Sequence, residues 1–422
     1  ANNDVAQLAA DSGSVTYVDA NALSIGAFNS IVGMTATGAV DICTASGDLT
    51  VSQNISATAI QLNAGQVTVV GTVTGGNVVL TGSPLLTAST GNAIIYTGSI
   101  LGSTGVAESS ASAGDGLIAF ASGHSRYNAD ETTDFSTGGW TDLGATGTYV
   151  VYREQPVISV AAVNKIVTYG DADPISYTTG SFSGLRNGDT AAIVTDTAVW
   201  NNTALTGGTT STGGKRIVGD YDVAYNSGLS NGLGYGFADN ASSVNELTVG
   251  KLSLSGSITA GGNTYGSGVT AGSVVFSNSI TGDSVTGDAV TVNTSGLLST
   301  SSNLRAGTHT GIQSVGAGLA GADAGNYSFA GTTANYKVDQ LALNGVIGSS
   351  SNVYGSGLVD GGVTYSNLVV SDLLTAPIIA ITTVGNTSLS GNLNAGSYTG
   401  IQSVSTLNGT DAANYSIGTF SG

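Results

Sequence analysis

The stretch that decides the fold reads VDICTASGDLTVSQNISATAIQL, over residues 40–62. In it, β-prone segments at 40–43, 49–51 and 59–62 alternate with Gly, Asn and Ser. The pattern extends outward to residues 67–70, 77–80 and 93–96. Successive segments lie about ten residues apart, which is too close for crossover helices, and no 3.6-residue apolar period is present. We therefore expect short strands over about residues 20–100.

Strands this short and evenly spaced predict a right-handed parallel β-helix, in which each coil takes about two segments and stacks on the next coil. An antiparallel meander is the alternative. Residues 101–150 lose the spacing and contain the most charged patch of the first half, with His124, Arg126, Asp130, Glu131 and Asp134. We expect a polar cap here, anchored by Trp140. A strand at 149–152 then leads into a linker, so residues 1–155 form the first predicted domain.

The C-terminal third repeats itself. Residues 263–268 (Asn-Thr-Tyr-Gly-Ser-Gly) return at 352–357 as Asn-Val-Tyr-Gly-Ser-Gly, and residues 311–315 return at 400–404, both with an offset of 89 (352 − 263 and 400 − 311). Residues 323–328 return at 411–416 with an offset of 88. Such a constant register indicates a duplicated structural unit. With a related unit before it, the pattern predicts tandem small β-sandwich or β-grasp-like repeats at 156–250, 251–340 and 341–422.

The repeats also predict two open ends. The alternating segment 334–343 bridges the second and third repeats, and an offset of 88 would place its counterpart near residue 422 (334 + 88). We therefore expect the third repeat to lack its last strand and the coil stack to begin without a cap. Unpaired edges are templates for other strands. The expected edges are Ala1, Asn2, Asn3 and Asp4 at one end and Thr419 and Phe420 at the other, which suggests head-to-tail self-association or continuation of a longer parent chain.

Charge and composition limit the partners. The 422 residues include 27 acidic and 9 basic ones, so the net charge is −18, which disfavours nucleic acid and anionic membranes. No stretch approaches the ~20 apolar residues of a membrane span, and the first residues lack the features of a signal peptide. Cys43 is the single cysteine, so no intramolecular disulfide can form. We expect it to be a small buried hydrophobe in an extracellular protein.

One family resemblance covers nearly the whole chain. Residues 163–174 (VNKIVTYGDADP), followed by 184–190 (GLRNGDT), resemble the Tyr-Gly-Asp repeats, or MBG domains, of filamentous-haemagglutinin-like adhesins. The Asn-x-Tyr-Gly openings and Asp-Ala-x-Asn-Tyr-Ser endings of the next two repeats resemble sister repeats of those exoproteins. Residues 19–26 and 47–51 are similar to the end of their β-helical stalk.

The resemblance implies a very large bacterial protein, exported by two-partner secretion and used for adhesion, biofilm cohesion or filament formation. It implies a secreted location, outside the cell or on the bacterial surface. Relative to the complete family pattern, the chain is expected to be a fragment or a matured subunit, because it contains neither the secretion-recognition domain nor the anchoring region. Cell-surface or matrix glycans are possible partners.

Catalytic candidates are few. His124 and His309 are the only imidazoles, they lie in different predicted domains, and Tyr398 replaces His309 in the third repeat. Paired carboxylates would serve a polysaccharide-processing enzyme. Asp130, Glu131 and Asp134 lack a neighbouring basic cluster, so we expect a solvated cap there. We predict no enzyme and no cofactor.

Calcium is the one metal worth considering, because acidic extracellular β proteins often bind it at oxygen-rich turns. Asp171 and Asp173, together with Asp189 or with Asp220 and Asp222, are weak candidates. No EF-hand loop or nonapeptide repeat is present, so turn-forming Asp residues are the favoured interpretation.

Three functions remain open on the sequence. The leading one is a structural and adhesive segment of an exoprotein. The second is a carbohydrate-binding module, which would show exposed aromatic side chains on one face. The third is a β-helical polysaccharide-processing enzyme, which would show a cleft with convergent carboxylates.

Overall fold

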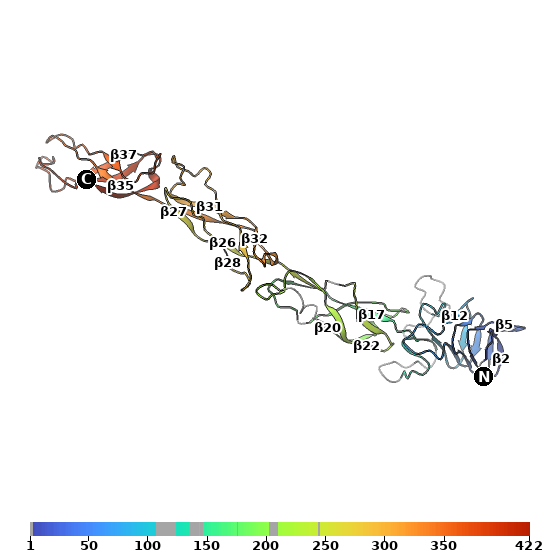
Figure 1. Ribbon diagram of the computed structural model, residues 1–422. Helices are drawn as coiled ribbons and strands as arrows, with labels where there is room; N and C mark the ends of the chain where they lie inside the picture. Colours follow the sequence, from blue (N-terminus) through green and yellow to red (C-terminus); the bar gives the residue numbers. More distant parts are fainter. Residues whose placement is uncertain are drawn as a thin grey trace. The chain divides into compact units, whose positions relative to one another are not determined.

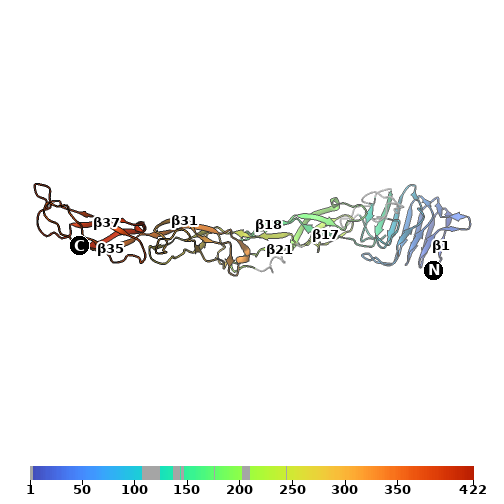
Figure 2. The same cartoon turned by 90° about the horizontal axis from the view of Figure 1, so that it is seen from above.

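The computed structural model describes residues 3–106, 124–135, 143, 147–174, 176–201, 210–243 and 245–422. In these ranges the chain is nearly all β-structure, with three 3-10 turns as its only helical elements (Figures 1 and 2). It divides into two compact units. The first holds residues 1–166, 172–208 and 220–248, and the second holds 167–171, 209–219 and 249–422. The prediction of an all-β chain is confirmed.

The first unit begins with three parallel sheets. One contains β1 (Gln7–Leu8), β4 (Leu23–Ile25), β9 (Leu49–Val51) and β12 (Val78–Leu80) in that order. The second contains β2 (Ala10–Ser12), β7 (Met34–Ala36), β10 (Ile55–Ala57) and β13 (Leu86–Ala88). The third contains β3 (Val15–Asp19), β8 (Val40–Thr44), β11 (Ile60–Ala64), β14 (Asn92–Thr97), β16 (Gly147–Tyr152) and β15 (Ser125–Arg126). A short hairpin, β5 (Ala27–Phe28) and β6 (Ile31–Val32), interrupts the series.

Successive strands of the chain join the three sheets in a fixed order. β9, β10 and β11 follow one another and each joins a different sheet, and β12, β13 and β14 repeat the sequence. Each turn therefore contributes three strands, and the expectation of about two segments per turn is wrong. The missed strands, such as Ile55–Ala57, are three residues long and contain small residues, so they give little periodic signal.

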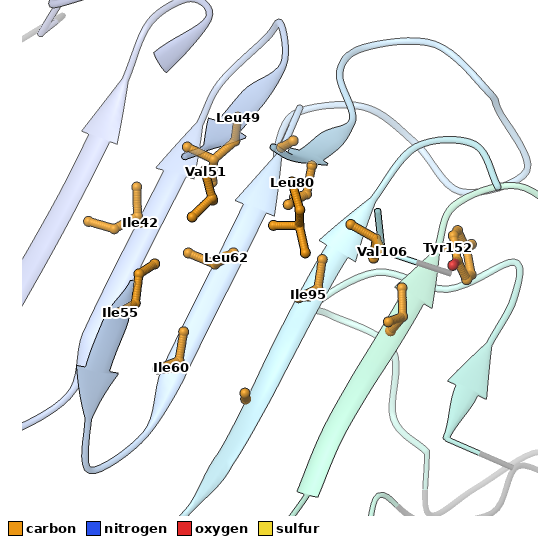
Figure 3. Packing of buried hydrophobic residues seen from close by; sticks show 14 of the residues in the cluster. Ile42, Leu49, Val51, Ile55, Ile60, Leu62, Leu80, Ile95, Val106 and Tyr152 are labelled. Atoms are coloured by element: carbon orange, nitrogen blue, oxygen red, sulfur yellow. The ribbon is translucent and has the colours of Figure 1, made fainter. Parts of the chain in front are cut away.

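The core of this stack is a set of side-chain ladders. Ile42 of β8 lies opposite Leu62 of β11, which lies opposite Ile95 of β14. All three side chains are fully buried, and they point into the space between the sheets (Figure 3). Burying one such side chain stabilises the fold by about 1.5–3 kcal/mol. In-register stacking of apolar side chains therefore supplies much of the stability of this stack.

Residues 67–70 do not form the predicted strand. They lie in the turn region between β11 and β12, with the side chains of Val67 and Val69 74% and 69% exposed. Gly71, Gly75 and Gly76 follow with positive φ, which bends the backbone away from an extended path. The β-branched residues here have no buried face to occupy, so their strand propensity has no packing to support it.

The remainder of the first unit is made of smaller sheets. β17 (Val157–Ala162) lies between β19 (Thr179–Ser183) and β23 (Gly236–Asp239), and β20 (Val194–Asn201) pairs with β22 (Ala224–Asn231). A 3-10 turn, η1, spans Ala191–Ile193. A further sheet, in the residues where the division between the two units falls, has the order β18 (Lys165–Thr168), β24 (Leu247–Gly250) and β21 (Gly219–Tyr221). Trp140, the predicted anchor of the cap, lies outside the described residues.

The second unit contains the sequence duplication. Its first part holds β25 (Leu252–Ser253), β26 (Gly256–Ile258), β27 (Gly261–Thr264), β28 (Val274–Phe276), β29 (Thr286–Gly287), β30 (Thr291–Val292), β31 (Gly307–Val315), β32 (Leu319–Ala320), η2 (Ala324–Asn326), β33 (Tyr327–Ser328) and β34 (Thr332–Asp339). Its second part holds β35 (Leu341–Ile347), β36 (Val363–Tyr365), β37 (Thr375–Ile381), β38 (Gln402–Asn408), η3 (Ala412–Asn414) and β39 (Tyr415–Ser421).

Strand registers follow the sequence offset. Gly256 pairs with Phe276 in one part and Gly345 pairs with Tyr365 in the other, each shifted by 89 (345 − 256 and 365 − 276). Val292 opposite Gln313 corresponds in the same way to Ile381 opposite Gln402. The two parts, called the second and third repeats below, therefore share a backbone pairing scheme as well as a sequence pattern.

Candidate inter-repeat joints

A carboxylate that accepts hydrogen bonds from two tyrosines recurs in the structure, half-buried at Asp283 and buried at Asp372 and Asp189. In the second unit, Asp283 Oδ2 accepts from the hydroxyls of Tyr169 and Tyr327, both at 2.5 Å. The two rings meet edge to face, with centroids 5.2 Å apart and an interplanar angle of 78°. We call this Tyr–Asp–Tyr arrangement a clasp. It joins residues far apart in sequence, because Tyr169 belongs to the Tyr-Gly-Asp motif and Tyr327 to the Asn-Tyr-Ser motif.

The next clasp has the same geometry 89 residues further along. Asp372 Oδ2 accepts from Tyr265 at 2.6 Å and from Tyr415 at 2.5 Å. The ring centroids are 5.4 Å apart at 76°. Tyr265 comes from the opening motif of the second repeat, whereas Asp372 and Tyr415 belong to the third. This clasp therefore connects two successive repeats.

A third clasp lies within the first unit. Asp189 Oδ2 accepts from Tyr235 at 2.8 Å and from Tyr127 at 3.2 Å, and the two rings are tilted with centroids 4.5 Å apart. Asn187 adds a bond from its Nδ2 to the Tyr127 hydroxyl at 2.8 Å. Tyr127 stands in the segment predicted to cap the parallel stack. The same device thus holds that segment to the following β-structure.

Each clasp is preorganised by one local turn. The amide of the clasp aspartate donates to the carbonyl three residues earlier, as from Asp372 to Val369 at 3.1 Å. The amide of that earlier residue donates to the second tyrosine hydroxyl, with Arg186, Ile280 and Val369 at 2.8, 2.9 and 3.0 Å. Each of these hydroxyls is therefore both a donor and an acceptor, so its hydrogen-bonding capacity is used while the ring is buried.

A second contact accompanies the clasp in the second unit. Asp323 Oδ2 accepts from the Thr212 hydroxyl at 2.5 Å and from the Ser284 amide at 2.7 Å. Asp411 receives the equivalent bonds from the Thr300 hydroxyl and, at 2.9 Å, from the Leu373 amide. The threonine in each pair of donors, Thr212 or Thr300, comes from the preceding repeat. Successive repeats are therefore connected at two separate carboxylates.

An asparagine makes the third contact. Asn326 Oδ1 accepts from the amide of Val218, and Asn414 Oδ1 accepts from the amide of Ala306, each at 2.9 Å. Both asparagines end the 3-10 turns η2 and η3 and are buried. The repeated Asp-Ala-x-Asn-Tyr segment thus supplies an aspartate, an asparagine and a tyrosine to one joint.

Burial and hydrogen bonding shift the titration of these groups. Burial first, and then the bond to Asp283, raise the pKa of Tyr327 to about 12. The same causes, with Asp372 in place of Asp283, raise the pKa of Tyr415. Burial acts to raise the pKa of Asp283, but the bonds from Tyr169 and Tyr327 outweigh it and lower that pKa. At neutral pH the Asp283 clasp therefore holds an ionised carboxylate and two neutral phenols.

Tyr354 stands 89 residues after Tyr265, and within the described residues its hydroxyl contacts no carboxylate. It donates to Ser388 Oγ at 3.0 Å and lies 3.2 Å from Ser390 Oγ, as Tyr265 contacts Ser299 and Ser301. All 17 tyrosines lie in the described part of the chain. Among them only Tyr354 is exposed, at 55%, whereas Tyr265 is 1% exposed.

The histidines predicted to be non-catalytic have structural contacts. The His124 ring stacks on Tyr149 with centroids 4.2 Å apart, and its Nδ1 lies 2.9 Å from the Thr148 carbonyl. His309 lies in β31, and its Nε2 is 2.7 Å from the Arg305 carbonyl. The two imidazoles belong to different units.

The acidic patch of the cap is used for hydrogen bonding. Glu131 accepts from Asn63 at 2.8 Å and from Gln66 at 2.6 Å, so it lies against the third parallel sheet. Asp130 accepts from the amide and hydroxyl of Thr132, which closes a local turn. Cys43 is buried, and burial followed by the nearby Asp41 raises its thiol pKa to about 12. A thiol with that pKa is a poor nucleophile at neutral pH.

The calcium candidates are not gathered into one site. Asp171 is exposed, and its carboxylate accepts from the Thr168 amide at 2.9 Å, which is the turn-forming role. Asp189 belongs to a clasp, and Asp220 accepts from the Thr248 hydroxyl at 2.7 Å. Asp173 makes contacts of its own. Over the described ranges, no group of three or more His, Cys, Asp or Glu side chains is placed to hold a metal ion.

The predicted assembly edges lie at the margins of sheets. Ala1 and Asn2 fall outside the described residues, Asn3 forms a parallel bridge with Asp19, and Asp4 is exposed. β1, β2 and β3 are the terminal strands of their three sheets. Thr419 and Phe420 lie in β39, which pairs with β35 on one side and is the last strand of its sheet. Whether these edges bind another strand stays a prediction.

The clasps were not predicted from the sequence, although two of their three residues lie in the repeated motifs. The signal that could have revealed them is the position of the aspartate. Asp283 and Asp372 differ by 89, the same offset as the motifs, while the residues before them differ. In the described part of the chain, no helix is long and apolar enough to cross a membrane.

Comparisons of this chain with protein-family models, curated proteins and solved structures gave no match.

Proposed function

We propose that this chain is a structural and adhesive segment of a large secreted bacterial exoprotein. In this proposal the parallel stack is a right-handed β-helix, and the sheets after it are tandem β-sandwich or β-grasp-like repeats. The sequence resemblance to filamentous-haemagglutinin-like adhesins motivates the proposal. The observation that carries it is the clasp, which recurs with the same three residue types at three successive positions.

A repeated joint of this kind suits a protein that transmits force. The second and third repeats are connected by two aspartates and one asparagine, so separating them breaks several hydrogen bonds at once. Bonds to a charged acceptor contribute about 1.5–3 kcal/mol each. Attachment itself would come from many weak polar contacts made by the Ser-, Thr- and Asn-rich surface, whose combined affinity exceeds that of any one contact.

Stretching the full chain by its two ends in a force spectrometer tests the proposal. We expect Asp372→Ala to lower the force needed to separate the second and third repeats, because two buried phenols lose their acceptor. Asp360→Ala is the matched control, since Asp360 is exposed and 12 residues away in the same repeat. If the two variants resist force equally, the clasp does not carry load and the structural role is wrong.

The adhesive part is measured separately on the unmodified chain. Tethered molecules are brought into contact with bacterial cells and with glycan-coated surfaces. Repeated weak ruptures whose number grows with contact area support adhesion. A single saturable rupture on one glycan, abolished by free sugar, would instead indicate a carbohydrate-binding module.

A further inference from the structure

The clasp of the first unit contains a chemically reactive pair of residues, Asn187 and Gly188. In an Asn-Gly pair the glycine has no side chain to hinder its own amide nitrogen, which can attack the neighbouring carboxamide. Asn187 and Gly188 form the turn that ends at the clasp aspartate Asp189, and both have positive φ, of 52° and 71°. Gly188 is exposed, and its amide donates to no described residue. The two reacting groups are therefore neighbours at the edge of the clasp.

The carboxamide of Asn187 is held through the clasp. Its Nδ2 donates to the Tyr127 hydroxyl at 2.8 Å, and its Oδ1 is buried without a partner in the described part of the chain. Tyr127 in turn donates to Asp189, which also accepts from Tyr235. When the clasp opens, the Asn187 side chain therefore loses this hydrogen bond and is free to rotate towards Gly188.

The other Asn-Gly pairs of the sequence are held by the main chain. They are Asn231-Gly232, Asn344-Gly345 and Asn408-Gly409. Asn231 Oδ1 accepts from three amides of the turn that follows it, at 2.8 to 3.0 Å, and its Nδ2 donates to a carbonyl at 2.9 Å. Asn344 Oδ1 accepts from the Thr419 amide at 2.7 Å, and Asn408 Nδ2 donates to the Ala376 carbonyl at 3.0 Å. Among the four, only Asn187 bonds to a clasp tyrosine.

We propose that Asn187 is a deamidation site, which the closed clasp protects and the opened clasp exposes. The Gly188 amide nitrogen gives up its proton and forms a bond to Cγ of Asn187. The bond from Cγ to Nδ2 then breaks, so that ammonia leaves and a cyclic imide remains. Water opens the imide at one of its two carbonyls and leaves aspartate or isoaspartate at position 187. Water is the only co-reactant in this sequence of steps.

Either product weakens the closed clasp. Aspartate at position 187 replaces the donor to the Tyr127 hydroxyl with an acceptor, and it adds a second negative charge at the hydroxyl that already bonds to Asp189. Isoaspartate also adds a methylene group to the main chain of the turn in which the Asp189 amide donates to the Arg186 carbonyl at 2.9 Å. A clasp that has opened and reacted therefore stays weakened. In the force-bearing role proposed above, on which this consequence rests, the change would record that the joint was opened by load.

Peptide mapping of the full 422-residue chain by mass spectrometry, after incubation at neutral pH, gives the deamidation rate of each Asn-Gly pair. The test variant is Tyr235→Phe, which removes the donor at 2.8 Å to Asp189 and leaves the bond from Asn187 to Tyr127 in place. We expect the rate at Asn187 to rise about tenfold, because losing a hydrogen bond to a charged acceptor changes the opening equilibrium by about this factor. The rates at Asn344 and Asn408, in the other unit, should stay unchanged.

Tyr415→Phe is the matched control, since it removes the equivalent donor from the clasp of the second unit. It should leave the rate at Asn187 unchanged. Urea below the unfolding transition provides a second measurement and keeps the test valid if Tyr235→Phe is poorly folded. As urea opens the clasp of the unmodified chain, the deamidation rate at Asn187 should rise in proportion to hydrogen exchange at the amides of Arg186 and Asp189.

Asn187→Asp reproduces one product and tests its effect on the clasp. We expect this variant to speed hydrogen exchange at the amides of Arg186 and Asp189 about tenfold or more, because one donor is lost and a like charge is added. Exchange at the amides of Val369 and Asp372, in the other unit, should stay the same.

Three outcomes overturn the proposal. One is a deamidation rate at Asn187 that neither Tyr235→Phe nor urea changes relative to Asn344 and Asn408. The second is an equal increase in Tyr415→Phe, which would mean that the clasp of the first unit does not control the reaction. The third is unchanged exchange at the clasp amides in Asn187→Asp. None of these measurements involves force, so failure here is distinct from failure of the proposed structural role.

Discussion

At the scale of single residues, the joints between repeats show how carboxylates are stabilised in a chain with few basic residues. The 27 acidic residues outnumber the 9 Lys and Arg three to one, so there are too few basic side chains to pair with all of them. Asp323 and Asp411 are stabilised as anions by hydroxyl and amide donors instead. The bonds from Thr212 and the Ser284 amide lower the pKa of Asp323. For Asp411, burial opposes this effect, but the donors, led by the Leu373 amide, still leave the pKa lowered.

These shifts predict a stability that falls at both extremes of pH. A carboxyl with a lowered folded-state pKa contributes stability above its unfolded pKa of about 3.9, and this is lost as the pH falls through the folded pKa. A phenol with a raised pKa, such as Tyr327 at about 12, contributes stability below about pH 10 that is lost as the pH rises through 12. We expect the thermal midpoint of the second unit, measured by calorimetry, to be highest between about pH 5 and pH 9.

A control separates the effect of the Asp323 carboxylate from that of the net charge. Protonating surface acids relieves repulsion among the excess negative charges, which opposes the predicted loss at low pH. The variant Asp323→Asn has no carboxylate at this position to be protonated. Its loss of stability below pH 4 should therefore be smaller than that of the unmodified chain. An identical acid decline in both proteins would contradict the assignment.

At the scale of secondary-structure elements, the sequence predicted the equivalent strands of the two repeats. It did not distinguish a strand from a turn at residues 67–70. The 89-residue offset predicted the equivalence of strand registers, because side-chain period and turn positions fix register. Segments 40–43 and 59–62 are strands because their apolar residues alternate into the core. The segment 67–70 has the same composition but lies at a turn, and composition alone does not distinguish these two environments.

The clasps could not be predicted for a different reason. Tyr127 lies in a segment without repeat similarity, and the aspartates follow unrelated residues, Arg186-Asn187-Gly188 in one case and Val369-Val370-Ser371 in another. What the three sites share is a backbone turn and a distance in space. In this sequence only the 89-residue spacing of Asp283 and Asp372 reflects the shared turn, and that spacing does not extend to Asp189.

A pair of core and turn substitutions checks the element boundaries. Leu62→Ala removes a fully buried side chain from the middle of a ladder and should destabilise the first unit by about 2–5 kcal/mol. Val69→Ala changes an exposed side chain in the turn and should alter stability by no more than about 0.5 kcal/mol. Urea unfolding followed by circular dichroism compares them. A large loss in Val69→Ala would mean that residues 67–70 pack as a strand after all.

At the scale of the whole molecule, stability is expected to be distributed over joints that act locally. In tandem-repeat proteins each element contacts mainly its neighbours, so stability is a sum of local terms. Global unfolding of such a chain is not a two-state process, which makes local opening the appropriate measure. The amides of Val369 and Asp372 report on the third-repeat clasp, and those of Arg186 and Asp189 report on the clasp of the first unit.

Double-mutant cycles measure how far each joint is coupled to the others. Tyr265→Phe and Tyr415→Phe remove two donors from the same carboxylate of Asp372, so their effects on local opening should deviate from additivity by about 0.5 kcal/mol or more. Tyr127→Phe and Tyr415→Phe affect clasps in different units that share no partner, so they should add to within about 0.3–0.5 kcal/mol. Native-state hydrogen exchange at the reporter amides gives each value.

The third repeat offers a matched control for these phenol deletions. The Tyr365 hydroxyl is buried and has no hydrogen-bond partner in the described structure, so Tyr365→Phe removes an unsatisfied group. We expect Tyr365→Phe to leave local opening unchanged or to make it rarer, whereas Tyr415→Phe should make it more frequent at Val369 and Asp372. Equal effects of the two substitutions would show that ring packing, and not the bond to Asp372, holds the repeats together. Coupling between Tyr127 and Tyr415 as large as that between Tyr265 and Tyr415 would instead mean that stability is shared across the chain.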